Sequence, residues 1–223
     1  MNDNITLEQV IQQNCINLLS HKDFGYKFIS KEDNLIFREN KTSVVLLKKV
    51  LIERLYAINS YEYKGQNYKF SASNIAKAVD DLDVSLNEGL IVANERITNH
   101  LVLGTSYEEN LDDGTKKSFS FKYIDFENIE NNHFFVTEEF IVDRANQNEI
   151  TKTRRPDLVV FVNGIPLVVI ELKKSSVNYE NGIKQLEKEQ KKDEIPHLFK
   201  YIQLTIAANS NEARYGTMGT PLK

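Results

Sequence analysis

Two short apolar segments joined by Asn163-Gly164 constrain the fold of this chain more than any other feature. They span residues 158–162 and 167–172, and an Asn-Gly pair between two such segments is the strongest short signal for a β-hairpin. Both segments are apolar at almost every position, so both faces of both strands are expected to be buried. The sequence therefore predicts a hairpin at the centre of a sheet that is covered on each side.

The segments around this hairpin predict an α/β fold with a mixed sheet flanked by helices. Pro196 is expected to end the last helix, because proline cannot continue one. The expected helices cover residues up to about 21, 42 or 43 to about 55, a short stretch from 73, 86–101 and 180–192. The expected strands cover residues 118–124, 134–142, 158–162, 167–172 and 201–207.

No linker rich in proline, glycine or serine divides the chain, so its 223 residues are expected to form one domain. A helical N-terminal part is expected at about residues 1–105. The part at about 106–223 would then hold the sheet and its central hairpin.

Composition narrows the class of protein. Hydrophobic residues make up 41% and charged residues 27% of the chain, as in ordinary globular proteins. The net charge of −4 does not favour nucleic acid as a partner, although a basic patch can lie on an acidic protein. Cys15 is the only cysteine, which excludes an internal disulfide and a four-cysteine zinc site. Without a signal-peptide pattern or a run that could span a bilayer, a cytoplasmic protein with no membrane contact is expected.

Three charged residues, Asp157, Glu171 and Lys173, interrupt the apolar strands of the hairpin. Charged side chains are rarely buried without a partner or a function. Glu171 and Lys173 are two positions apart in a strand, so they share a face. The hairpin can bring Asp157 beside them.

This set of residues is suited to the hydrolysis of a phosphodiester. Mg²⁺ prefers oxygen ligands, and the carboxylates of Asp157 and Glu171 with the backbone carbonyl of Leu172 would supply them. Such a metal polarises a phosphoryl oxygen and lowers the pKa of bound water. The Lys173 ammonium would orient that water and offset negative charge in the transition state. These residues therefore predict a catalytic magnesium site.

The site places a condition on the register of the hairpin. If Asn163-Gly164 were a plain two-residue turn, Asp157 would oppose Ile170 and lie on the opposite face from Glu171. An odd-length loop or one β-bulge returns both acids to one face. The catalytic interpretation therefore predicts an irregular hairpin.

The same residues resemble a known family. Pro156-Asp157, thirteen residues and then Glu171-Leu172-Lys173 match the PD-(D/E)xK nuclease motif. The wider segments RRPDLVVFVNGIPLVVIELKKS, IPHLFKYIQLTIAANS and the upstream IDFENIENNHFFVTEEF resemble the nuclease domain of the restriction (R) subunit of type I restriction-modification enzymes. The resemblance is best from about residue 120 onward, and it implies a restriction-endonuclease-like fold whose catalytic core is the second part of the chain.

The resemblance implies Mg²⁺-dependent cleavage of double-stranded DNA. In that family the nuclease is fused to an ATP-driven motor and works with methyltransferase (M) and specificity (S) subunits, so the target sequence is read elsewhere. The chain has no GxxxxGK[ST] phosphate loop. It is therefore expected to be a fragment of a longer protein, with ATP bound only by the missing motor.

The resemblance also implies supporting residues. Gln185 matches the glutamine of a QxxxY motif on the helix after the lysine, but Glu189 stands at the tyrosine position. Glu8 lies where related nucleases place another acid near the metal. Arg154 and Arg155 either contact a DNA phosphate or are solvated at the start of a strand.

Other interpretations remain open. Asp157, Glu171 and Lys173 could form a salt-bridged hairpin edge without catalysis. The chain could also be a PD-(D/E)xK nuclease of another repair or defence system, or a non-catalytic module that docks DNA or a subunit. The complete set of two acids and a lysine argues against docking, because docking does not need all three.

Overall fold

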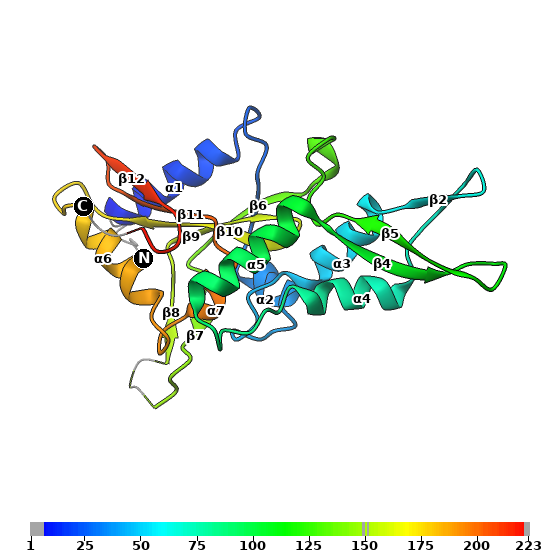
Figure 1. The fold of residues 1–223 in the computed structure, drawn as a ribbon. Helices are drawn as coiled ribbons and strands as arrows, with labels where there is room; N and C mark the ends of the chain where they lie inside the picture. Colours follow the sequence, from blue (N-terminus) through cyan, green and yellow to red (C-terminus); the bar gives the residue numbers. More distant parts are fainter. Residues whose placement is uncertain (1–6, 149, 151, 221–223) are drawn as a thin grey trace.

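The computed structural model describes residues 7–148, 150 and 152–220, which form a mixed sheet with helices around it (Figure 1). The sheet has six strands in the order β1-β6-β9-β10-β11-β12, with parallel pairing of β1 to β6 and of β10 to β11. The predicted α/β fold is confirmed, and the two apolar strands of the hairpin are its central pair. The strands are β1 (Lys27–Ile29), β6 (Phe134–Glu138), β9 (Leu158–Val162), β10 (Ile165–Leu172), β11 (Leu204–Ala208) and β12 (Ala213–Gly216).

Helices cover both faces of the sheet, as the apolar strands predicted. On one face, Ile16 of α1 packs with Leu158 and Ile170. On the other face, α3 and α6 contribute Leu51 and Leu186 to the main core. The helices are α1 (Leu7–Leu19), α2 (Lys31–Phe37), α3 (Lys48–Ile58), α4 (Ala72–Asp81), α5 (Leu90–Leu103), α6 (Glu180–Glu189) and α7 (Pro196–Phe199).

Two small hairpins extend from one end of the molecule beside α4 (Figure 1). Tyr61 stacks on Phe119 with ring centroids 4.1 Å apart, which joins the two hairpins.

Among the described residues, no helix is both long enough and apolar enough to cross a bilayer. The minor elements are β2 (Tyr61–Tyr63), β3 (Gln66–Tyr68), β4 (Thr105–Asn110), β5 (Lys116–Phe121), β7 (Val142–Asp143), β8 (Thr153–Arg154) and the 3₁₀ turn η1 (Ile129–Asn131).

The turn between β9 and β10 is fixed by contacts on both of its residues. Asn163 and Gly164 have φ angles of 53° and 85°, as the two central residues of this kind of hairpin turn require. The buried Asn163 amide oxygen accepts a 2.8 Å hydrogen bond from the N–H of His133. The carbonyl of Gly164 accepts a 2.9 Å bond from the N–H of Leu47, just before α3. The central hairpin is therefore anchored to the helical layer at its turn.

The hairpin contains the irregularity that the catalytic interpretation required. Near the turn, Pro166 pairs with Phe161, but further along the strand Ile170 pairs with Leu158. The register shifts by one residue between Pro166 and Val168, and this bulge moves Asp157 into line with Glu171. The prediction of an irregular hairpin is confirmed.

The helix expected from residue 42 or 43 begins later than predicted. It is α3, which starts at Lys48. The guanidinium of Arg38, which is 1% exposed, donates a 2.8 Å hydrogen bond to the carbonyl of Thr42 and another bond to the carbonyl of Val44. Because these carbonyls bind the buried Arg38, the segment takes an irregular path into the core.

Three further expectations need correction. The first part of the chain is not wholly helical, since it contributes β1 to the main sheet and the β2–β3 hairpin. The strand expected at 134–142 ends at Glu138, and Glu139 has a φ of 45°. Pro196 does not end the long helix, which already ends at Glu189. Instead it begins α7, where a proline in the first turn loses no helical hydrogen bond.

Candidate active site

Asp157 is held at the start of β9 by contacts on its side chain and its backbone. Its Oδ2 accepts a 2.7 Å hydrogen bond from the N–H of Leu172. Its carbonyl accepts a 3.0 Å bond from Nε2 of Gln12, a buried residue of α1. The bond to Leu172 keeps the carboxylate against the end of β10, next to Glu171.

Glu171 is 1% exposed and lies under α6. The helix comes close because residue 182 is glycine: a Cβ there would lie 3.4 Å from Cγ of Glu171 and 3.1 Å from Cβ of Ala207. One oxygen of Glu171 pairs with the ammonium of Lys173. The other, Oε2, is buried and has no hydrogen-bond partner in the described part of the chain.

Residues of α6 complete the site. Nζ of Lys173 donates a 3.0 Å hydrogen bond to Oε1 of Gln185, and Nε2 of Gln185 donates a 3.2 Å bond to Oε1 of Glu189. Glu189 is 1% exposed. In the sequence Glu189 stands out only because it replaces the tyrosine of the QxxxY motif, although its spacing of four from Gln185 already places both on one face of a helix.

Burial makes the charged forms of these acids costly. It raises the pKa of Asp157, although the N–H of Leu172 and the charge of Lys173 oppose the shift. Burial, and then the charge of Asp157, raise the pKa of Glu171 to about 8 against the influence of Lys173. Burial also raises the pKa of Glu189 to about 7, and Glu194 and Asp157 add to this shift.

The charge balance of the site favours a bound cation. Burial alone would lower the pKa of Lys173, but its hydrogen bond to Glu171 and the charges of Glu171 and Asp157 raise it overall. Asp157 and Glu171 therefore share the Lys173 ammonium in a partly desolvated site. A further positive charge would relieve the repulsion among the acids.

The donor set suits a hard cation but is small. Among the described residues, no group of three or more His, Cys, Asp or Glu side chains is arranged to hold a metal ion. The oxygen donors expected from the sequence are the carboxylates of Asp157 and Glu171 with the carbonyl of Leu172. The unpartnered Oε2 of Glu171 fits such a cation, because a buried carboxylate oxygen without a partner is otherwise unfavourable.

The remaining candidate residues lie at the margins. Glu8, exposed on α1, is near enough for its charge to raise the pKa of Asp157. Nε of Arg154 lies 2.6 Å from Oε2 of the buried Glu194, so this arginine is held in an internal ion pair. The Arg155 side chain is 58% exposed, with Nη1 3.5 Å from Oε1 of Glu139. Of the two arginines, Arg155 is the more accessible to solvent.

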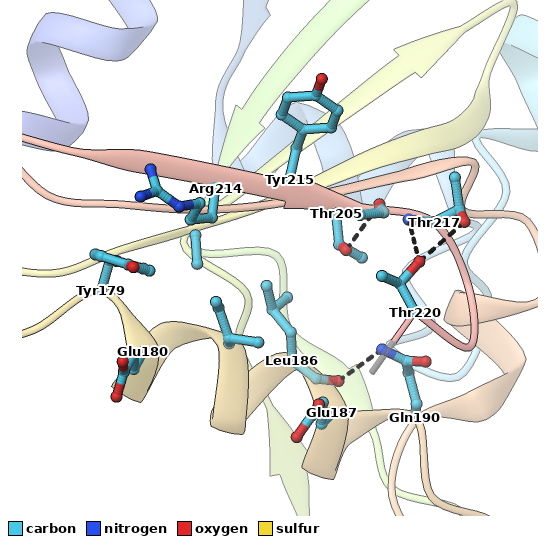
Figure 2. A pocket seen from close by; sticks show the side chains of 13 residues that line it. Tyr179, Glu180, Leu186, Glu187, Gln190, Thr205, Arg214, Tyr215, Thr217 and Thr220 are labelled. Carbon is cyan, nitrogen blue, oxygen red and sulfur yellow. Dashed lines mark hydrogen bonds between the residues drawn. The ribbon is translucent and has the colours of Figure 1, made fainter. Parts of the chain in front are cut away.

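A separate cavity of about 160 Å³ lies between α6 and the strands β11 and β12 (Figure 2). Leu186 and Glu187 of α6 line it, whereas Gly182, Gln185 and Glu189 do not. None of the three predicted catalytic residues lines it. Asp157, Glu171 and Glu189 therefore lie outside the lining of this cavity.

The chain matches the family described as type I restriction enzyme R protein N terminus, over residues 5–223. The chain belongs to this family. The resemblance noted in the sequence is therefore confirmed, and membership suggests a divalent metal cofactor.

Individual relatives agree with the family match. One from Methanocaldococcus jannaschii, provisionally named the type I restriction enzyme MjaIXP endonuclease subunit, is 30% identical over 213 residues, covering 94% of this chain and 19% of that protein. The type I restriction enzyme HindI endonuclease subunit of Haemophilus influenzae is 30% identical over 151 residues, covering 66% of this chain and 13% of that protein. The chain thus spans less than a fifth of the length of these relatives.

Proposed function

We propose that this chain is the endonuclease domain of the R subunit of a type I restriction enzyme and that it cuts double-stranded DNA with Mg²⁺. The observation that carries the proposal is the placement of Asp157 beside Glu171, with Lys173 bonded to Glu171. The β-bulge between Pro166 and Val168 produces this placement, and a purely structural hairpin would not need it.

Each residue has a defined task in this proposal. Asp157, Glu171 and the carbonyl of Leu172 would hold the metal, which supplies phosphoryl polarisation and a lowered pKa for bound water. Lys173 orients the attacking water and offsets charge that develops on the phosphate. Gln185 accepts a hydrogen bond from Lys173 and so limits the positions of its ammonium.

The wider proposal follows from the family. The complete cytoplasmic enzyme would join this domain to an ATP-driven motor and to M and S subunits, and the S subunit would read the target. A nuclease of another repair or defence system would use the same three residues. A docking module would not need the buried Glu171 and the half-buried Asp157 in mutual repulsion, and this disfavours it.

The test uses the full R subunit, assembled with its partners, on duplex DNA with Mg²⁺ and ATP. Asp157→Asn keeps an oxygen that can accept the hydrogen bond from Leu172 but removes the charge. Cleavage is expected to fall at least about a hundredfold, while ATP hydrolysis persists because the motor lies elsewhere. Normal cutting by this variant would refute the assignment.

A further inference from the structure

Glu189 is a buried acid to which the proposed reaction gives no task. It is 1% exposed, and its Oε2 has no hydrogen-bond partner among the described residues. Burying a carboxylate without full compensation costs stability. A compensating role in the site would account for an acid at this position.

The only hydrogen bond described for its side chain connects Glu189 to the site through Gln185. The Gln185 amide has one accepting and one donating end. Its Nε2 donates to Glu189 at 3.2 Å, so its oxygen faces Lys173, which donates to it at 3.0 Å. A lysine ammonium can only donate, so the reversed amide would place two donors against each other.

We propose that Glu189 is a positioning residue: it orients the Gln185 amide so that the amide oxygen holds the Lys173 ammonium beside Glu171. This inference rests on the proposed nuclease function. An apolar residue at position 189 would leave the amide free to turn over or to move away. The ammonium would then lose one of the contacts that define its place.

The geometry of α6 makes this role specific to one face of the helix. Gly182, Gln185 and Glu189 lie on the face toward Glu171 and Lys173. Glu187 instead lines the separate cavity. The same substitution at Glu187 and at Glu189 therefore provides a matched comparison within one helix.

The first test replaces Glu189 with an unbranched apolar residue in the assembled enzyme. Glu189→Met is expected to lower the cleavage rate about tenfold to a hundredfold, the scale of loss from a displaced catalytic group, with DNA affinity unchanged. Thermal stability should stay the same or rise, because a buried acid has been removed. A merely structural role for Glu189 predicts instead that thermal stability falls before the cleavage rate does, and that result would overturn the proposal.

A double-variant comparison then tests the route through Gln185. If Glu189 acts only by orienting this amide, Gln185→Met with Glu189→Met should cut no more slowly than Gln185→Met alone. Losses that multiply would overturn the proposal. Glu189→Gln, which keeps an accepting oxygen, should recover most of the rate lost in Glu189→Met, and failure to do so would also count against it.

The controls separate this inference from the nuclease assignment. Glu187→Met should cut within about twofold of the unmodified enzyme, because Glu187 lines the separate cavity and does not contact Gln185 or Lys173 in any described hydrogen bond. Asp157→Asn is assayed in parallel. If cutting depends on Asp157 but Glu189→Met cuts normally, only the role of Glu189 fails. If cutting does not depend on Asp157, the proposed function itself fails.

Discussion

The carboxylate of Asp157 accepts a 2.7 Å hydrogen bond from the backbone N–H of Leu172, where the pairing of β9 and β10 ends. The neighbouring Pro156 has no N–H, and its carbonyl is bonded at 3.1 Å to the N–H of Phe140. The Asp157 carboxylate therefore accepts the hydrogen bond of the last N–H of β10, and the same contact holds Asp157 beside Glu171.

Glu171→Gln is expected to separate stability from activity. Burial raises the pKa of Glu171 to about 8, so this carboxyl is protonated more readily than a free glutamate, and glutamine imitates its neutral form. The free energy of unfolding should change by less than about 1 kcal/mol. Cleavage should fall at least about a hundredfold, because a neutral amide binds a divalent cation poorly.

Chemical denaturation without metal and a cleavage assay with Mg²⁺ check this pair of effects. Glu180→Gln, at the start of α6 and outside the proposed metal site, is the control for both measurements. A destabilisation of several kcal/mol by Glu171→Gln would show that the folded protein requires the ionised carboxylate.

The placement of Asp157 beside Glu171 and Lys173 was predictable because it depends on local rules. Alternation along a strand placed Glu171 and Lys173 on one face, and the spacing from Asp157 required an irregular hairpin. The position of the bulge next to Leu167 was not predictable. The carbonyl of Leu167 accepts a 2.8 Å bond from the N–H of Gln203, a contact with a segment distant in sequence.

Elements that depend on distant contacts were missed or misplaced. β1 has only three residues, and it is a strand because Phe28 and its neighbours pair with β6, more than a hundred residues away. The helix expected from residue 42 starts late because Arg38 binds the carbonyls before it. The place of Glu189 in the site depends on the close approach of α6 at Gly182, which the helix pattern does not reveal.

Gly164→Ala is expected to destabilise the protein strongly. The φ of Gly164 is 85°, and a Cβ there would lie 2.7 Å from the carbonyl oxygen of Leu47 and 3.0 Å from the N of Leu51. Backbone atoms of α3 cannot yield easily, so the loss should be about 2 to 4 kcal/mol. Equilibrium unfolding measures it.

Gly65→Ala is the matched control for this prediction. Gly65 has a similar φ of 76°, but a Cβ there would meet nothing within 4 Å. Its loss should be only about 1 to 2 kcal/mol, the backbone strain alone. Equal losses at the two positions would contradict the argument from close contact with α3.

His197 is expected to make stability depend on pH on the acidic side. Burial lowers its pKa from 6.5 to about 4, and the charges of Lys200 and Arg38 act in the same direction. The unfolded chain therefore binds a proton at pH values where the folded protein does not. This contribution to stability is present above about pH 6.5 and is lost as pH falls toward 4.

His197→Gln should flatten this dependence, with a difference of roughly 1 to 3 kcal/mol across the window. Unfolding is measured at several pH values for the unmodified protein, for this variant and for His21→Gln, which changes an exposed histidine. Acidic groups also change protonation in this pH range. The effect of His197 is therefore read from the differences among the stability curves of the three proteins. Parallel curves for all three would remove His197 as the cause.

The 223-residue chain alone is expected to fold but to cut DNA slowly. Apolar clusters on both faces of the sheet give it a core of its own. Its net charge of −4 provides little general attraction to phosphates, on which affinity for DNA largely depends. A Mg²⁺ site with only two carboxylates also relies on phosphate oxygens from the substrate, so metal binding without DNA should be weak.

Circular dichroism and thermal unfolding check that the chain folds, and linear and circular duplex DNA with Mg²⁺ serve as substrates. Asp157→Asn measures the background from contaminating nucleases. Slow cutting by the chain alone, together with fast cutting by the assembled enzyme, would place delivery of the DNA outside this domain. Efficient cutting that depends on Asp157 would instead show that local charges near the site, such as Arg155 at the surface, overcome the unfavourable net charge.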